Sequence, residues 1–203
     1  RLNWESDNSA NVNPNYRANP ADYPINTKSS PISVANYNGV GGGTILFAGH
    51  YPRFHPSDFR VKTTDGVADD WPIDYDTLAP FYAENDRMTG VAGLAGDPAY
   101  PLSPPKEPTM PPVPMGRSGM TLAKGFNQLG WHWWPSDIAI ATTDYDGRAR
   151  CINLGACGSG CAQGAKASTD VTYWPHALRA GVRIKTWCRV KSVTTDEIGR
   201  AHV

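Results

Sequence analysis

The chain of 203 residues carries 19 Lys and Arg against 19 Asp and Glu, so its formal charge at pH 7 is zero. No basic field favours nucleic acid or an anionic membrane surface, and we therefore expect no nucleic-acid partner. With 40% hydrophobic residues, the chain can bury the core of one sizeable globular domain. No apolar run approaches the roughly 18 residues of a membrane-spanning helix, so we expect no direct membrane insertion.

Residues 1–30 are polar and rich in Asn and Pro, which predicts an extended surface arm. The chain starts with Arg1 and stops at Val203, inside what reads as the second strand of a hairpin. We therefore expect it to be a piece of a longer protein.

Residues 31–60 contain a glycine-rich turn, Val40-Gly-Gly-Gly-Thr44, which runs into an apolar stretch. Such a loop brings bare backbone N–H groups close to something negative, and Gly42, Gly43 and the Thr44 hydroxyl are the candidate donors. An ordinary tight turn is the alternative.

Residues 61–150 are predicted to be a loop-rich segment with short helices. Asp76 can cap a helix that Gly90 closes. Prolines dominate residues 93–115 and forbid regular helix or central strand there. A short helix is predicted over residues 120–129, and Gly130 ends it.

The run Trp131-His132-Trp133-Trp134 follows this helix. Its indoles are expected in a core or a pocket wall. His132 could touch a substrate, although a His among aromatic rings is more often a hydrogen-bonded core residue.

Residues 151–166 hold three cysteines, Cys151, Cys157 and Cys161, separated largely by small residues. The small residues let the backbone curl around a compact anionic cluster and point N–H groups at its sulfides, which favours an iron–sulfur cluster. Zinc normally requires four ligands in closely spaced pairs. A disulfide remains open because the chain has four cysteines in all.

Residues 167–203 are predicted to form a helix and a strand hairpin. Ser168 can cap the helix, and the alternation over residues 182–190 predicts a strand. Within that strand Cys188 reads as a small buried hydrophobe. A hairpin through residues 196–199 ends the chain.

With these pieces in order, the chain resembles the glucose-methanol-choline (GMC) family of flavin oxidoreductases. The segments that carry the resemblance over residues 30–203 are Val40-Gly-Gly-Gly-Thr44, His50-Tyr-Pro-Arg-Phe-His-Pro-Ser-Asp-Phe59, Asp70-Trp-Pro-Ile-Asp-Tyr75 and Cys157-Gly-Ser-Gly-Cys161. Within the family, the branch of gluconate, fructose and glucose dehydrogenase large subunits is the most similar. The fold class implied is α+β or α/β, the central part of a GMC-type FAD-binding fold with long ordered loops and without the N-terminal Rossmann unit.

The resemblance implies two cofactors, FAD and a [3Fe-4S] cluster. The cluster ligands would be Cys151, Cys157 and Cys161. Many members have Asn or His where this chain has Phe47, so an aromatic face replaces a polar flavin contact. The FAD-contacting residues implied by the resemblance are Gly41, Gly42, Gly43, Thr44, Phe47, Ala48, His50 and Val190.

By the same resemblance, FAD accepts a hydride from the CH–OH carbon of a sugar, sugar acid or other alcohol. The His pair that works on the hydroxyl is expected in a C-terminal part outside this sequence, so no catalytic residue is assigned here. Expected partners are a cytochrome c-type electron-accepting subunit and a small companion subunit, in a periplasmic, membrane-associated assembly. A cytoplasmic location, a GMC alcohol oxidase without a cluster, and a binding module stapled by disulfides or metal are the alternatives.

Overall fold

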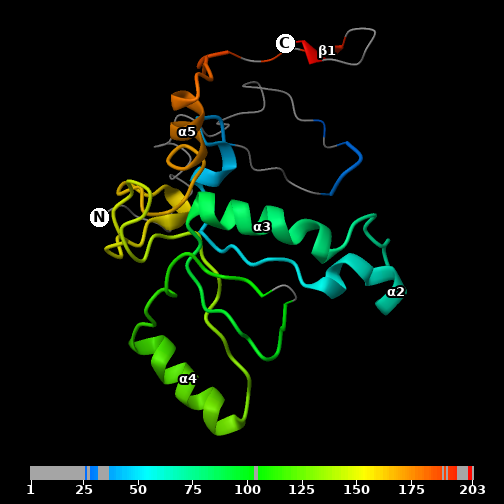
Figure 1. Cartoon of the computed structure of the whole chain (residues 1–203), viewed down its shortest axis with the longest axis vertical. Helices are drawn as coiled ribbons and strands as arrows, with labels where there is room; N and C mark the ends of the chain where they lie inside the picture. Colours follow the sequence, from blue (N-terminus) through cyan, green and yellow to red (C-terminus); the bar gives the residue numbers. More distant parts are fainter. Residues whose placement is uncertain are drawn as a thin grey trace.

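The computed structural model describes residues 26, 28–31, 37–102, 105–188, 190, 192–195 and 201–202. These residues form helices joined by long loops, with little sheet (Figure 1). The α-helices are α2 (Val61–Asp65), α3 (Tyr75–Thr89), α4 (Arg117–Leu129) and α5 (Tyr173–Arg179). Short 3₁₀ turns are η1 (Gly42–Ile45), η2 (Pro56–Arg60) and η3 (Cys157–Ser159). The predicted arm over residues 1–30 lies almost entirely outside the described residues.

The first predicted helix is confirmed as α3, but its N-cap is different. The side chain of Asp74 accepts a 2.8 Å hydrogen bond from the Thr77 amide, whereas Asp76 lies inside the first turn. Gly90 closes the helix with φ 68°. Asp74 satisfies one of the orphan N–H groups at the helix start, which explains why the helix begins two residues earlier than expected.

The second predicted helix is α4, which begins at Arg117 and is followed by Gly130 in the left-handed region. Ser168 does not cap a helix as predicted. Its carbonyl accepts hydrogen bonds from Val171 and Thr172 in a preceding turn, and α5 starts only at Tyr173. Pro175 therefore lies in the first turn of α5, where a helix tolerates proline.

The predicted strand over residues 182–190 is wrong for the described residues 182–188 and 190, which are irregular. Trp187 has φ 60° and is fully exposed, and Cys188 is exposed rather than buried. A left-handed backbone at an aromatic residue interrupts an extended strand. The terminal hairpin is confirmed by β1 (Thr194–Thr195), which pairs antiparallel with β2 (Ala201–His202).

The main core forms where the segment 138–141 meets three other segments. Its backbone pairs with Gly49 (Ala139 N to Gly49 O, 2.7 Å), with Ala92 (Ala92 N to Ile138 O, 2.9 Å) and with Ala165 (Ala141 N to Ala165 O, 2.9 Å). Ala92, Ala141 and Ala165 are completely buried. Their small side chains let the backbones approach closely, which brings the glycine-rich loop and the cysteine segment to the same place.

Gly49 is required at this junction. It has φ 92°, and a Cβ there would stand 3.0 Å from the side chain of Ile140. An L-residue would be strained by the backbone conformation and crowded by the neighbouring segment.

A second core lies between η2 and the start of α3. Phe59, Tyr75 and Ala79 are buried there, and Trp71 packs against Phe59 at a ring separation of 6.1 Å. None of the helices in the described part of the chain is long and apolar enough to cross a bilayer.

Candidate functional site

The glycine-rich loop forms the short turn η1 and leaves an open face. Gly41 and Gly42 both have positive φ, 98° and 54°. No atom lies within 4 Å of the position that a Cβ would take on Gly42 or Gly43. Such a bare, open backbone is the kind of surface that a cofactor chain can approach closely. The residues present therefore fit the approach of FAD to this loop.

The donors of this loop are partly used by the loop itself. The Gly42 amide donates to the Gly39 carbonyl at 2.9 Å. The Thr44 hydroxyl donates to the Gly41 carbonyl and accepts a 3.0 Å hydrogen bond from the Thr169 amide. Thr44 thus stabilises the conformation of the loop. The open backbone at Gly42 and Gly43 is the part of the loop that can face a cofactor.

Beyond the turn, the chain offers three of the side chains that were predicted to contact flavin. Phe47 is half-buried, whereas Ala48 and His50 are exposed. The backbone of His50 forms a bridge with Ile138, which fixes this stretch against the core. Val190, in the irregular segment after α5, is 58% exposed.

Lys166 is the residue that sequence reasoning missed. It is 1% exposed, and its Nζ donates to the carbonyl oxygens of Ile45 at 2.5 Å, Phe47 at 2.7 Å and Thr44 at 3.2 Å. The ammonium also lies 4.9 Å from the centre of the Phe47 ring, within cation–π range. A lysine among small residues, Gly-Ala-Lys-Ala-Ser, was the sequence signal for burial at this position.

The environment of Lys166 contains sulfur as well. Burial lowers its pKa, whereas the nearby Cys157, Cys161 and Asp170 favour the charged form and offset part of that effect. The result is a pKa below the ordinary value of a lysine. The same ammonium thus lies between the glycine-rich loop and the cysteine segment.

Cys161 lies in a cradle of backbone amides. Burial raises the pKa of its thiol, but N–H groups of Lys166, Ala165, Gln163 and Gly164 outweigh that effect and hold the pKa below its ordinary value. Converging amides stabilise an anionic sulfur, whether it is a free thiolate or a ligand. These amides follow Cys161 in the chain, whereas the small residues expected to supply N–H groups lie between the cysteines.

The three cysteines are close in sequence, yet the structure does not assemble them into a metal centre. All four cysteines, each of which lies in the described part of the chain, are free thiols. Among the described residues, no three Cys, His, Asp or Glu side chains gather to hold a metal ion. The [3Fe-4S] cluster predicted for Cys151, Cys157 and Cys161 is therefore not shown by the described residues and stays a prediction.

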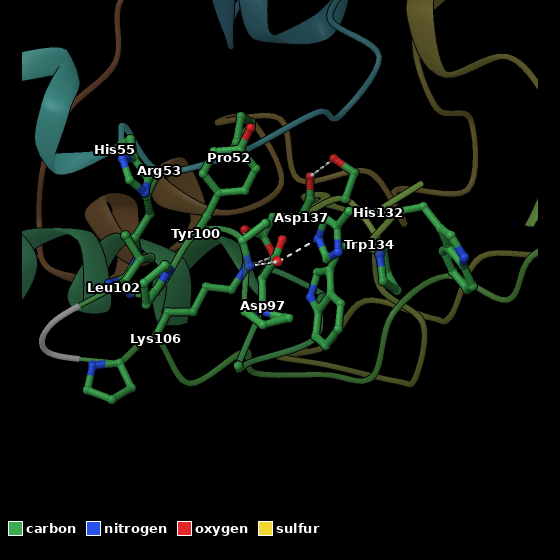
Figure 2. A pocket seen from close by; sticks show the side chains of 18 of the residues that line it. Pro52, Arg53, His55, Asp97, Tyr100, Leu102, Lys106, His132, Trp134 and Asp137 are labelled. Carbon is green, nitrogen blue, oxygen red and sulfur yellow. Dashed lines mark hydrogen bonds and ion pairs between the residues drawn. The ribbon is translucent and has the colours of Figure 1, made fainter. Parts of the chain in front are cut away.

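A pocket of about 860 Å³ has lining residues that begin two positions after His50 in the sequence, and it lies between the segments 52–58, 96–102, 105–106 and 132–137. Figure 2 shows His132 directed at Asp97, with Lys106 beside Asp137. His132 Nε2 lies 2.7 Å from an Asp97 oxygen, and its ring stacks on Trp134. His132 is thus neither a core residue nor unpaired, but part of a pocket wall.

The cations of this pocket are neutralised by carboxylates. Lys106 forms a close ion pair with Asp137. Arg53 pairs with Asp86 at 2.7 Å, with side chains only 5% and 9% exposed. The pocket therefore combines aromatic walls with cations that are already paired, a chemistry that suits a neutral ligand with hydrogen-bonding groups.

Comparison with known proteins supports the resemblance. Residues 111–202 match the GMC oxidoreductase family. The 2-methyl-1,2-propanediol dehydrogenase of Mycolicibacterium austroafricanum is 42% identical over 184 residues, which cover 90% of this chain and 33% of that protein. The fructose dehydrogenase large subunit of Gluconobacter japonicus is 34% identical over 128 residues, or 63% of this chain and 24% of that protein.

An oxidase matches as well. The paromamine 6'-oxidase of Streptomyces fradiae is 27% identical over 162 residues, which cover 77% of this chain and 28% of that protein. The chain spans about a third or less of the length of these relatives. By their names, all three relatives are oxidoreductases. This chain belongs to the GMC oxidoreductase family.

Proposed function

We propose that this chain contributes the flavin-contacting loop of an FAD-dependent dehydrogenase that oxidises a CH–OH group of a small alcohol, polyol or sugar. The observation that carries the proposal is the open backbone at Gly42 and Gly43, fixed against the buried segment 138–141 through Gly49. The 42% identity to a diol dehydrogenase supports it.

In this proposal the chain's own residues bind and orient. Gly41, Gly42, Gly43 and Thr44 form the backbone surface along the cofactor, and Phe47, Ala48, His50 and Val190 supply further contacts. FAD, when bound, supplies the acceptor for a hydride from the alcohol carbon. Phe47 presents an aromatic face and no hydrogen-bond donor, so the loop contributes shape and polarisability at that point.

The pocket beyond His50 is proposed to lie on the substrate side. Because Lys106 is already paired with Asp137 and His132 already contacts Asp97, a charged ligand would have to compete with existing partners. A neutral hydroxylated molecule can instead hydrogen-bond to these groups and stack on the indoles. A small diol or a sugar has this chemistry.

The test is anaerobic mixing of the full-length protein with 2-methyl-1,2-propanediol, fructose and gluconate in separate experiments. The proposal predicts a flavin absorbance that one of these alcohols bleaches. A protein that binds no flavin, or a bound flavin that none of a broad panel of alcohols reduces, would contradict it.

The electron acceptor is a separate proposal. A [3Fe-4S] cluster on Cys151, Cys157 and Cys161, and a cytochrome c-type subunit with a small companion in the periplasm, rest on the cysteine spacing and on the resemblance. The amide cradle of Cys161 supports an anionic ligand there. Iron and acid-labile sulfide in the anaerobically purified protein would support the cluster, and their absence would refute it.

A GMC oxidase without a cluster is the second candidate. The match to an oxidase favours it. Oxygen consumption during turnover distinguishes the two candidates, because a dehydrogenase of this kind passes its electrons to another redox protein.

A further inference from the structure

The buried ammonium of Lys166 has an unusual set of partners. A buried lysine is normally paired with a carboxylate. Lys166 instead donates to three backbone carbonyls of one loop, from Thr44, Ile45 and Phe47. Since an ammonium has three donors, this set uses all of them.

Two of the three carbonyls, those of Thr44 and Ile45, are ones that a short helical turn leaves without partners, and the third belongs to Phe47, just beyond the turn. Thr44 and Ile45 end η1, and the last carbonyls of such a turn have no intrahelical donor. A cation at this end is favoured by the aligned peptide dipoles. Lys166 lies 121 residues after Ile45 in the sequence, and it caps the C-terminal end of η1.

A second tether acts at the start of the same loop. The Thr169 hydroxyl donates to the Gly41 carbonyl at 3.2 Å, and the Thr169 amide donates to the Thr44 hydroxyl at 3.0 Å. The segment from Lys166 to Thr169 thus holds both ends of η1, and it directly follows the Cys161 turn. The segment that follows the cysteines therefore fixes the conformation of the loop.

We infer that Lys166 is the positioning residue of the flavin loop: by binding its carbonyls, it keeps the peptide groups of residues 41–47 in the orientation that receives FAD. The inference rests on the proposed FAD function. Lys166 acts through the loop backbone. It therefore affects the affinity for FAD and the environment of the flavin directly, and hydride transfer only through them.

The first experiment needs no variant. The folded full-length protein, stripped of FAD, is treated briefly with acetic anhydride, and acetylation of each lysine is measured by mass spectrometry. Lys166 is expected to react at least about tenfold more slowly than the exposed Lys124 of α4, because its Nζ is enclosed by the three carbonyls. Equal rates at the two lysines would overturn the inference.

The second experiment compares Lys166→Met with Lys166→Arg, and uses Lys124→Met as the matched control. Lys166→Met is expected to raise the FAD dissociation constant about tenfold or more and to speed amide hydrogen exchange over residues 41–48 in the FAD-free protein. At saturating FAD, its visible flavin circular dichroism should also change. Lys166→Arg keeps donors and charge, so it should recover part of the affinity, whereas Lys124→Met should match the parent.

Wild-type FAD affinity and unchanged exchange in Lys166→Met would refute the positioning role. If Lys166→Met does not fold, the acetylation result and Lys166→Arg decide the matter. A parent protein that binds no FAD would instead refute the proposed function. The FAD-free exchange and acetylation measurements would still report on the Lys166 contacts.

Discussion

The Nζ of Lys166 lies 2.7 Å from the carbonyl oxygen of Phe47, although 119 residues separate the two in the sequence. This contact joins the loop predicted to receive FAD to the segment that carries Cys157 and Cys161. Two features that the sequence suggested independently are therefore parts of one structural unit.

Substitution of Thr169 tests the same contact between the glycine-rich loop and the segment 166–169, with a smaller expected effect. Thr169→Val removes the hydroxyl that binds the Gly41 carbonyl, and we expect FAD affinity to fall about fivefold, the equivalent of one hydrogen bond. Thr169→Ser retains the hydroxyl and should stay close to the parent. Flavin fluorescence titration measures both, and equal affinities for the Val and Ser variants would contradict the prediction.

The Arg53–Asp86 pair is predicted to be a structural requirement for the pocket region. Arg53→Met removes the two nitrogens that donate to Oδ2 of the nearly buried Asp86 carboxylate, and we expect a loss of about 3 kcal/mol in the free energy of unfolding. Urea denaturation measures this loss. Lys62→Met, which removes the exposed pair with Asp69, is the control and should change little.

The same pair predicts a dependence of stability on pH. Burial raises the pKa of Asp86, and the hydrogen bonds and charge of Arg53 offset this only in part. The Asp86 carboxyl therefore stays protonated to higher pH in the folded protein than in the unfolded chain. Its contribution to the free energy of unfolding is greatest below its ordinary pKa and falls as pH rises through its pKa in the folded protein.

Asp86→Asn cannot ionise and lacks this dependence. The stability of the parent relative to Asp86→Asn should therefore be greater at about pH 4 than at about pH 7. Urea unfolding at the two pH values measures the difference. A parent that gains stability over the variant as pH rises would contradict it.

Gly93 is predicted to be required beside the Lys106–Asp137 pair. A Cβ on Gly93 would stand 2.2 Å from an Asp137 oxygen, so Gly93→Ala must displace that carboxylate. We expect a loss of about 1–3 kcal/mol in unfolding free energy. Gly125→Ala is the control: its Cβ meets nothing within 4 Å in α4, and it should gain about 0.5–1 kcal/mol. Equal effects of the two substitutions would refute the packing argument.

Local signals predicted where α3 and α4 end better than where the helices begin. The apolar face before Gly90 and the glycine at 130 gave the ends of α3 and α4, because a left-handed glycine closes a helix by its own conformational freedom. The N-cap of α3 was misplaced because Asp74 and Asp76 are chemically equivalent candidates. Only the hydrogen bond to Thr77 distinguishes them.

The predictions that failed depended on distant partners. Alternation over residues 182–190 resembles a strand, but strand formation requires a neighbouring strand, and Trp187 adopts a left-handed backbone. Lys166 was missed for a related reason, because its partners are carbonyls, which no side-chain pattern reveals. The amide cradle of Cys161 was not predicted either, because its N–H groups come from residues 163–166 and not from the small residues between the cysteines.

Amide hydrogen exchange of the full-length protein with and without FAD tests the central claim most directly. We expect FAD to slow exchange over residues 41–50 and to leave exchange in α4, residues 117–129, unchanged. Tight FAD binding without added protection at residues 41–50 would contradict it.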